Sequence, residues 1–144
     1  ATKLIVPNTV WSVLHKQPEV EYEGKIYTSD MVLGSDRRGL SVSYCTDTRP
    51  VDGLPAFIEG SDLFICEGMY GEEEKLAKAK EYKHMLFSEA ARLAKAGNVR
   101  EMWLTHFSPA MPFPEMYIKN ARDIFENTHL GKDRKTVSLM FDDE

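Results

Sequence analysis

Several features that define whole classes of proteins are scarce in this 144-residue sequence. It has only two cysteines, Cys45 and Cys66, and both lie in apolar, strand-like runs. A disulfide framework is therefore not expected, and buried free thiols in a reducing cytoplasm fit better. No apolar run approaches the roughly 20 residues that cross a bilayer, so no membrane partner is predicted. The formal charge of −5 excludes a basic footprint for nucleic acid over the whole chain.

What is present is the composition of an ordinary globular protein. Hydrophobic residues make up 42% and charged residues 28% of the chain, and both values are typical of a globular domain. The length suits one domain that buries a real core. We therefore expect residues 1–144 to form a single domain.

Apolar runs alternate with helical patterns along the chain. Four strands are expected over residues 40–45, 62–68, 99–106 and 135–141, and helices over residues 72–83, 84–97 and 114–127. Before them, a helix is expected to begin at Pro7-Asn8 and a hairpin to turn at Glu23-Gly24. The alternation of strands and helices predicts an α/β fold built from packed layers.

Three of the expected strands lead into a side chain that can carry chemistry. Asp47, Glu67 and His106 end the segments "SYCTD", "LFICE" and "MWLTH". In layered α/β folds the C-terminal ends of the strands line one edge, where sites are commonly built. His84 is expected to open the helix over residues 84–97 and to border the same edge.

Each of these four side chains also has a structural explanation. Asp47 suits a metal bridge, but it also suits a turn before Pro50. His106 suits a metal ligand, but also a buried histidine bonded to a carbonyl. Glu67 would orient a histidine or be a solvated loop carboxylate, and His84 would donate a proton or lie half-exposed at a helix start. For each residue alone the structural explanation is simpler, because one aspartate and one histidine are too few ligands for zinc.

The order of the motifs resembles a known family. The segments "YCTDTRP", "SDLFICE" and "LTHFSP", with a histidine and an alanine-rich helix between the last two, resemble the C-terminal half of ribonuclease Z. That family is the tRNA 3′-processing endonuclease branch of the metallo-β-lactamase superfamily. Residues 6–39 are also similar to the family's approach to the aspartate, so the resemblance covers nearly the whole chain.

The resemblance implies a fold and a set of site residues. The fold would be the C-terminal half of an αββα sandwich, with a mixed sheet and helices on one face. The full-length enzyme would be a hydrolase with two zinc ions that cleaves a phosphodiester bond in RNA, with a tRNA precursor as its substrate. Asp47 would bridge the two metals and His106 would be a terminal metal ligand. Glu67 would orient His84, which assists the leaving oxygen. Thr48, Arg49 and Ser108 would support these residues or contact phosphate.

The main metal motif of the family, H-x-H-x-D-H, is absent from this chain. Its four histidines, His15, His84, His106 and His129, do not have that spacing, and His15 and His129 are expected to be structural or surface residues. We therefore expect the N-terminal half of the fold to be missing from this chain. Zinc binding by the chain is then expected to be partial at most, and cleavage of RNA by the chain alone to fail.

Three details differ from the motifs of the family. Cys66-Glu67-Gly68-Met69 replaces His-Glu-Ala-Thr, Met85-Leu86 replaces Ser-Thr, and Ala110-Met111 replaces Arg-Tyr. The missing arginine would lie near the substrate phosphate, which favours a diverged hydrolase with a non-tRNA substrate as one alternative. A second alternative is a non-catalytic half-fold. Half of a sandwich leaves an apolar sheet face uncovered, which predicts a homodimer.

Overall fold

A computed structural model describes residues 5–142 and divides them into two compact units, one up to Arg38 and one from Gly39 onward. The sequence predicted a single domain over residues 1–144. That assignment stays a prediction, and within the described residues each unit builds its own hydrophobic cluster. Within the part of the chain that the structure describes, no helix is both long and apolar enough to cross a membrane.

The first unit is a helix followed by a hairpin. It contains α1 (Asn8–Leu14), β1 (Glu19–Tyr22), β2 (Lys25–Thr28) and the short 3-10 helix η1 (Ser29–Met31). Its cluster consists of Val6, Val10, Leu14 and Tyr27. The hairpin turns at Glu23 and Gly24, as predicted, and both residues have a positive φ. That geometry matches the right-handed twist of the two strands.

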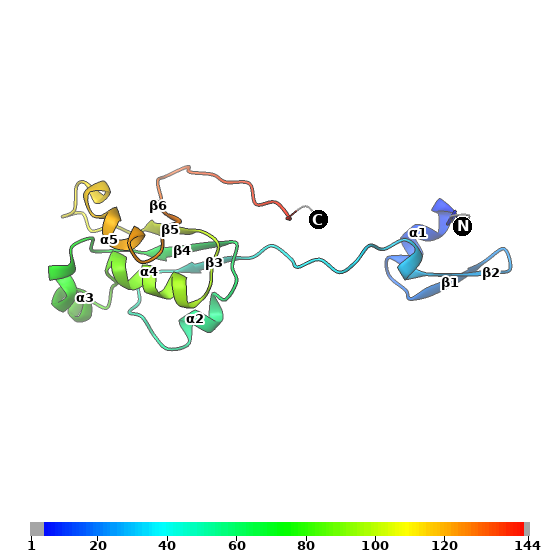
Figure 1. Ribbon diagram of the computed structural model, residues 1–144, viewed down its shortest axis with the longest axis horizontal. Coiled ribbons are helices and arrows are strands. Elements are labelled where there is room, and N and C mark those ends of the chain that lie inside the picture. Colours follow the sequence, from blue (N-terminus) through cyan, green and yellow to red (C-terminus); the bar gives the residue numbers. More distant parts are fainter. Residues whose placement is uncertain (1–4, 143–144) are drawn as a thin grey trace. The chain divides into compact units, whose positions relative to one another are not determined.

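The second unit is built on a four-stranded sheet (Figure 1). Its strands are β3 (Val42–Cys45), β4 (Leu63–Glu67), β5 (Met102–Thr105) and β6 (Thr128–Leu130), in the order β3-β4-β5-β6. The α/β fold class is confirmed, but the sheet is not mixed. All three strand pairs are parallel, and the antiparallel pair β1-β2 forms a separate sheet.

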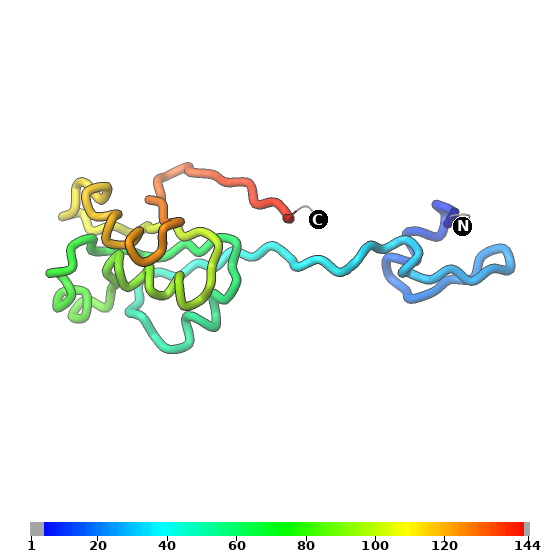
Figure 2. Tube along the Cα trace, viewed as in Figure 1, coloured from blue at the N-terminus to red at the C-terminus, as the bar shows by residue number. Residues whose placement is uncertain are grey.

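Helical crossovers connect these parallel strands, and the path of the chain can be followed in Figure 2. The helical segments are α2 (Leu54–Phe57), η2 (Glu73–Lys75), α3 (Leu76–Tyr82), α4 (Phe87–Ala96), η3 (Pro114–Met116) and α5 (Ile118–Arg122). Neighbouring strands follow one another in sequence, so crossovers of the usual right hand all lie on the same face. Residues next to or within α2, α4 and α5 accordingly share one core.

The core lies between α4 and one face of the sheet. In register across the strands, Cys45, Cys66 and Leu104 point to this face, where Phe87 and Ala91 of α4 are fully buried. Both cysteines are buried and free, as predicted. The hydrogen bond between the two thiols, together with burial, raises the pKa of Cys66 well above its usual value.

The other face of the sheet is partly open. Val42 and Tyr44 on β3 are 55% and 63% exposed. Trp103 on β5 is buried, and the Lys135 ammonium lies 4.4 Å from the centre of its indole ring. An apolar face left open at β3 agrees with the uncovered sheet face expected for half of a sandwich.

Two predicted elements at the end of the chain were wrong. Residues 135–141 form no strand, and the fourth strand is β6, which contains His129. The alternating pattern of residues 135–141 finds no partner strand, and Met140 is 75% exposed. The preceding helix α5 ends at Arg122 rather than continuing to Asn127, because residues from Thr128 pair with β5.

Candidate metal centre

The C-terminal ends of β3 and β5 bring Asp47 and His106 together. Asp47 lies two residues beyond β3, and His106 directly follows β5. Both residues adopt the left-handed backbone conformation, with φ of 52° and 58°. This conformation is unfavourable for residues other than glycine and is often found at functional sites. Here it marks the two points where the chain leaves the sheet.

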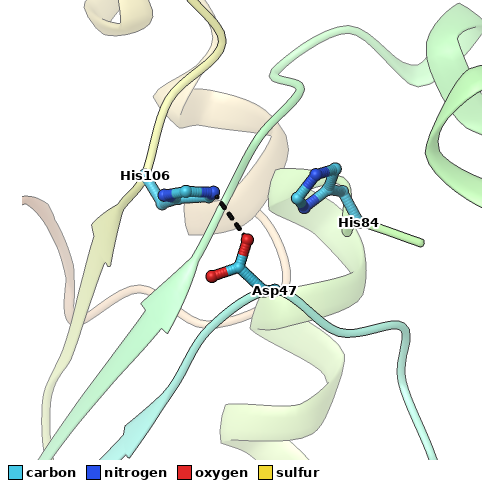
Figure 3. Close-up of side chains that lie close together, drawn as sticks. All are labelled: Asp47, His84 and His106. Carbon is cyan, nitrogen blue, oxygen red and sulfur yellow. Dashed lines mark ion pairs between the residues drawn. The ribbon is translucent and has the colours of Figure 1, made fainter. Parts of the chain in front are cut away.

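The side chains of Asp47, His84 and His106 converge (Figure 3). His106 Nε2 lies 3.1 Å from Asp47 Oδ1, and the ring centres of His84 and His106 are 5.5 Å apart. One ligand atom from each of the three residues lies within 4.8 Å of the other two. Side chains predicted to line one edge of the sheet therefore lie close together. The cluster contains His84 in addition to Asp47 and His106, the two metal ligands that the sequence predicted.

Glu67 is the buried centre of the hydrogen-bond network behind this cluster. Its side chain is fully buried, which excludes the solvated loop carboxylate considered above. The backbone N–H of Thr48 donates to Oε1 at 2.6 Å, and the backbone N–H of Met85 donates to Oε2 at 3.0 Å. His84 Nδ1 lies 3.1 Å from Oε2. A carboxylate accepts hydrogen bonds, so Nδ1 carries the hydrogen and Nε2 remains for a metal or a substrate.

His84 does not open a helix, contrary to prediction. It lies between α3, which is followed by Lys83 in a left-handed conformation, and α4, which begins at Phe87. The intervening Leu86 forms a parallel bridge with Tyr70, and this pairing keeps the segment extended. His84 is thus held by a short connection whose backbone bonds reach α3, Tyr70 and Glu67.

The three supporting residues predicted from the sequence have different positions. Thr48 and Arg49 belong to the network, through the Thr48 N–H bond to Glu67 and a bond from Arg49 Nη1 to the carbonyl of His84 at 2.7 Å. Ser108 is not part of it. Its N–H donates to the carbonyl of Met69 and its hydroxyl accepts from the N–H of Ala110. Ser108 therefore shapes the loop after His106.

The donor set fits a divalent metal ion of the zinc type. Imidazole nitrogen and carboxylate oxygen are both zinc ligands, at about 2.0–2.2 Å, so two ligand atoms of a tetrahedral site lie about 3.3 Å apart. The 3.1 Å separation of Asp47 and His106 matches this spacing. Three protein ligands with one position left for water or substrate are typical of catalytic zinc. Asp47, His84 and His106 are therefore the residues able to hold such an ion.

The motif differences have structural reasons. A Cβ atom on Gly68 would lie 2.8 Å from the ring of Phe87, so alanine would need Phe87 to move. Met111 is buried in the core and its sulfur accepts the N–H of Gly71, so this position faces inward. At the start of α4, Leu86 has no hydroxyl to cap the helix.

Glu89 is the functional candidate that the sequence analysis missed. Its carboxylate accepts the N–H of Leu86 at 2.9 Å and pairs with both terminal nitrogens of Arg49. A glutamate three residues after a helix N-cap is a known capping signal. The signal was overlooked because the N-cap residue here is leucine rather than serine or threonine.

Two solved structures show which class of fold this chain shares. A metallo-β-lactamase fold protein from Bacillus subtilis has a TM-score of 0.55 and 28% identity, and the match covers 63% of this chain and 36% of that chain. The short form of human tRNase Z has a TM-score of 0.52 and 26% identity, covering 66% and 32%. The chain thus has part of the metallo-β-lactamase fold.

The sequence comparison identifies a particular relative. Ribonuclease Z of Clostridium acetobutylicum is 58% identical over 137 residues, which are 95% of this chain and 44% of that protein. No family model matches the chain. The predicted resemblance to the C-terminal half of ribonuclease Z is confirmed, and this chain is a homologue of part of that enzyme. It spans slightly less than half the length of the curated relatives that it matches.

Proposed function

We propose that this chain is the C-terminal part of a zinc-dependent phosphodiesterase that processes the 3′ ends of tRNA precursors. The observation that carries the proposal is the convergence of Asp47, His84 and His106 in front of the buried Glu67. The relatives named ribonuclease Z and tRNase Z support the choice of RNA as substrate. In the part of the chain that the structure describes, the cluster offers three ligand atoms for a site that needs more to hold two ions, so we propose that the chain does not cleave RNA alone.

Asp47 and His106 would hold the metal in this scheme. When bound, zinc supplies a water that is deprotonated near neutral pH and positive charge for the reacting phosphate. Asp47 is largely exposed, so one carboxylate oxygen remains accessible when the other faces His106. That accessibility suits the bridging role in a site completed by a second set of ligands.

His84 and Glu67 would act on the leaving group. Glu67 holds Nδ1–H and so fixes the orientation of the ring within the cluster, which leaves Nε2 for the substrate. When the imidazole is protonated, Nε2–H gives its proton to the departing oxygen as the P–O bond breaks. Burial of Glu67 fixes the ring without mobile water between the two groups.

The variant His84→Ala distinguishes two roles of His84, proton donation to the leaving group and binding of the metal as a third ligand. The second role is also compatible with ligand atoms that lie within 4.8 Å of one another. In an enzyme completed by the missing part of the fold, we expect His84→Ala to lower cleavage by about 10²–10⁴-fold, the usual contribution of a general acid. In the chain alone, we expect it to change metal affinity little. Zinc affinity of the chain is measured by competition with a chromophoric chelator. A large loss of affinity in His84→Ala would show that His84 is a ligand and contradict the proton-donor role.

A segment swap tests the function as a whole. In the swap chimera, the matching 137 residues of Clostridium acetobutylicum ribonuclease Z are replaced by this chain, which is 58% identical there. We expect the swap chimera to cleave precursor tRNA at its 3′ end, and the chain alone to be inactive and to bind fewer than two zinc ions. An inactive but folded chimera, or two zinc ions on the chain alone, would contradict the proposal.

The alternative of a non-tRNA substrate has one specific observation in its favour. Ala110 occupies the position of the expected arginine, so an exposed methyl group replaces the guanidinium there. If the swap chimera hydrolyses a simple phosphodiester such as bis(p-nitrophenyl) phosphate but not precursor tRNA, this alternative replaces the first.

The predicted homodimer is supported by the exposed Val42 and Tyr44, and light scattering measures whether the chain forms it. The cytoplasmic location stays a prediction supported by the two free thiols and can be checked by cell fractionation.

A further inference from the structure

A half-buried ion pair links the loop after Asp47 to the first turn of α4. Arg49 Nη1 donates to Glu89 Oε2 at 2.6 Å, and Nη2 donates to Glu89 Oε1 at 2.5 Å. The side chains are only 21% and 11% exposed. Two parallel charge-assisted bonds of this kind fix geometry as well as adding energy, and limited exposure protects them from screening by salt.

The same two side chains also hold the backbone around His84. Arg49 Nη1 donates a second bond to the carbonyl of His84, and Glu89 accepts the N–H of Leu86. Residues 84–86 are thus held at both ends by one ion pair. Among residues 5–142, no hydrogen bond or ion pair joins Glu89 to the three ligand-bearing side chains, yet its bonds reach the segments that carry two of them.

Asp47 has little else to hold it. It is among the exposed residues of the cluster, and its backbone is left-handed, a conformation that is uncommon in residues other than glycine although aspartate and asparagine adopt it more readily than most. Within residues 5–142, the side chains bonded to Asp47 are His106 and its neighbour Thr46, whose hydroxyl donates to Oδ2 at 3.2 Å. The loop is anchored instead one and two residues later, where Thr48 bonds Glu67 and Arg49 bonds Glu89.

We propose that Glu89 is a positioning residue of the metal centre, which sets the placement of Asp47 beside His106 and His84 through Arg49 and the N–H of Leu86. This inference rests on the proposed function, because the placement of Asp47 matters for function only if Asp47 binds a metal ion. It concerns a residue that neither the motifs nor the ligand cluster indicated. Loss of outer partners that orient metal ligands typically costs about 10–100-fold in metal affinity.

The alternative is that Glu89 only caps α4. Glu89→Gln separates the two roles, because glutamine keeps an oxygen that accepts the N–H of Leu86 but loses the charge that pairs with Arg49. Arg49→Met removes the same ion pair from the other side. Asp123→Asn is the matched control, since it breaks the exposed ion pair of Asp123 with Lys119 far along the chain on α5.

The first measurement is amide hydrogen exchange in the metal-free chain. Under the proposal, Glu89→Gln and Arg49→Met each speed exchange of the Thr48 amide by at least about tenfold, because its bond to Glu67 depends on the position of the loop. The double variant is no worse than the singles, as expected for one shared interaction. Asp123→Asn leaves Thr48 unchanged. If Thr48 keeps its protection in Glu89→Gln, Glu89 is only a cap and the proposal is overturned.

The second measurement is titration of the same chains with Co²⁺ alone, followed by its visible absorption. We expect Glu89→Gln to weaken Co²⁺ affinity by about 10–100-fold and to alter the absorption bands. Wild-type affinity in Glu89→Gln would overturn the proposal. If the wild-type chain itself binds no Co²⁺, the proposed metal site of this chain fails, and the exchange of Thr48 then decides the positioning role separately.

Discussion

Replacement of Asp47 by alanine in the swap chimera is expected to lower kcat/KM for precursor tRNA by at least about 10³-fold. The side chain is the proposed bridge between metal ions, and metal ions contribute several kcal/mol of transition-state stabilisation. About 4 kcal/mol corresponds to a factor of roughly 10³ in rate. Stability should change little, because Asp47 is largely exposed. Steady-state cleavage and zinc content are measured on the same preparation.

Two further variants separate loss of the ligand from strain. Asn tolerates the left-handed backbone better than Ala does, so Asp47→Asn keeps the turn while removing the negative charge. It should be nearly as inactive as Asp47→Ala. Asp52→Ala, an exposed acid in the same loop, should keep full activity. Full activity of both Asp47 variants would show that Asp47 is not part of the metal centre.

Replacement of Glu67 by alanine is expected to lower the free energy of unfolding of the second unit by about 3–5 kcal/mol. The change leaves the buried N–H groups of Thr48 and Met85 and the His84 ring without their acceptor. Leaving buried donors unpaired, or breaking a buried pair on one side, costs this much in general. The total free energy of unfolding of most domains is only about 5–15 kcal/mol, so the effect should be large.

The measurement needs a signal from the second unit alone. Trp103 lies in β5 and Trp11 lies in the first unit, so urea unfolding is followed by tryptophan fluorescence in a Trp11→Phe background. Glu67→Gln should lower the free energy of unfolding less than Glu67→Ala does, since glutamine keeps one of the two acceptor oxygens and only the other position becomes a donor. Glu74→Ala, at an exposed glutamate, is the control and should change stability by less than about 0.5 kcal/mol. Equal stability of Glu67→Ala and Glu74→Ala would show that the hydrogen bonds accepted by Glu67 do not stabilise the second unit.

Much of the second unit was predictable from local patterns. The strands before Asp47, Glu67 and His106 were found because apolar runs between turn residues suit buried strands. The convergence of these three residues followed from the general rule that parallel strands end at one edge. The helix that ends at Gly97 was found from its amphipathic stripe, and α4 does end at Ala96.

The errors came from contacts that local patterns do not contain. Residues 135–141 alternate like a strand, but the place beside β5 is taken by β6. His84 looked like the first residue of a helix, yet the bridge of Leu86 to Tyr70 delays the helix. Its membership of the ligand cluster depends on Glu67 and Arg49, which are 17 and 35 residues away in the chain.

The sequence by itself determined which residue types stand at the ends of the strands and the kind of fold that presents them, because residue type and hydrophobic period are local properties. The tertiary structure decided how those residues are held. It buried Glu67, turned His84 toward Asp47 and His106, and placed Glu89 behind Arg49. These arrangements depend on hydrogen bonds between segments far apart in sequence, whose geometry exists only after the parallel strands have paired and α4 has packed on the sheet.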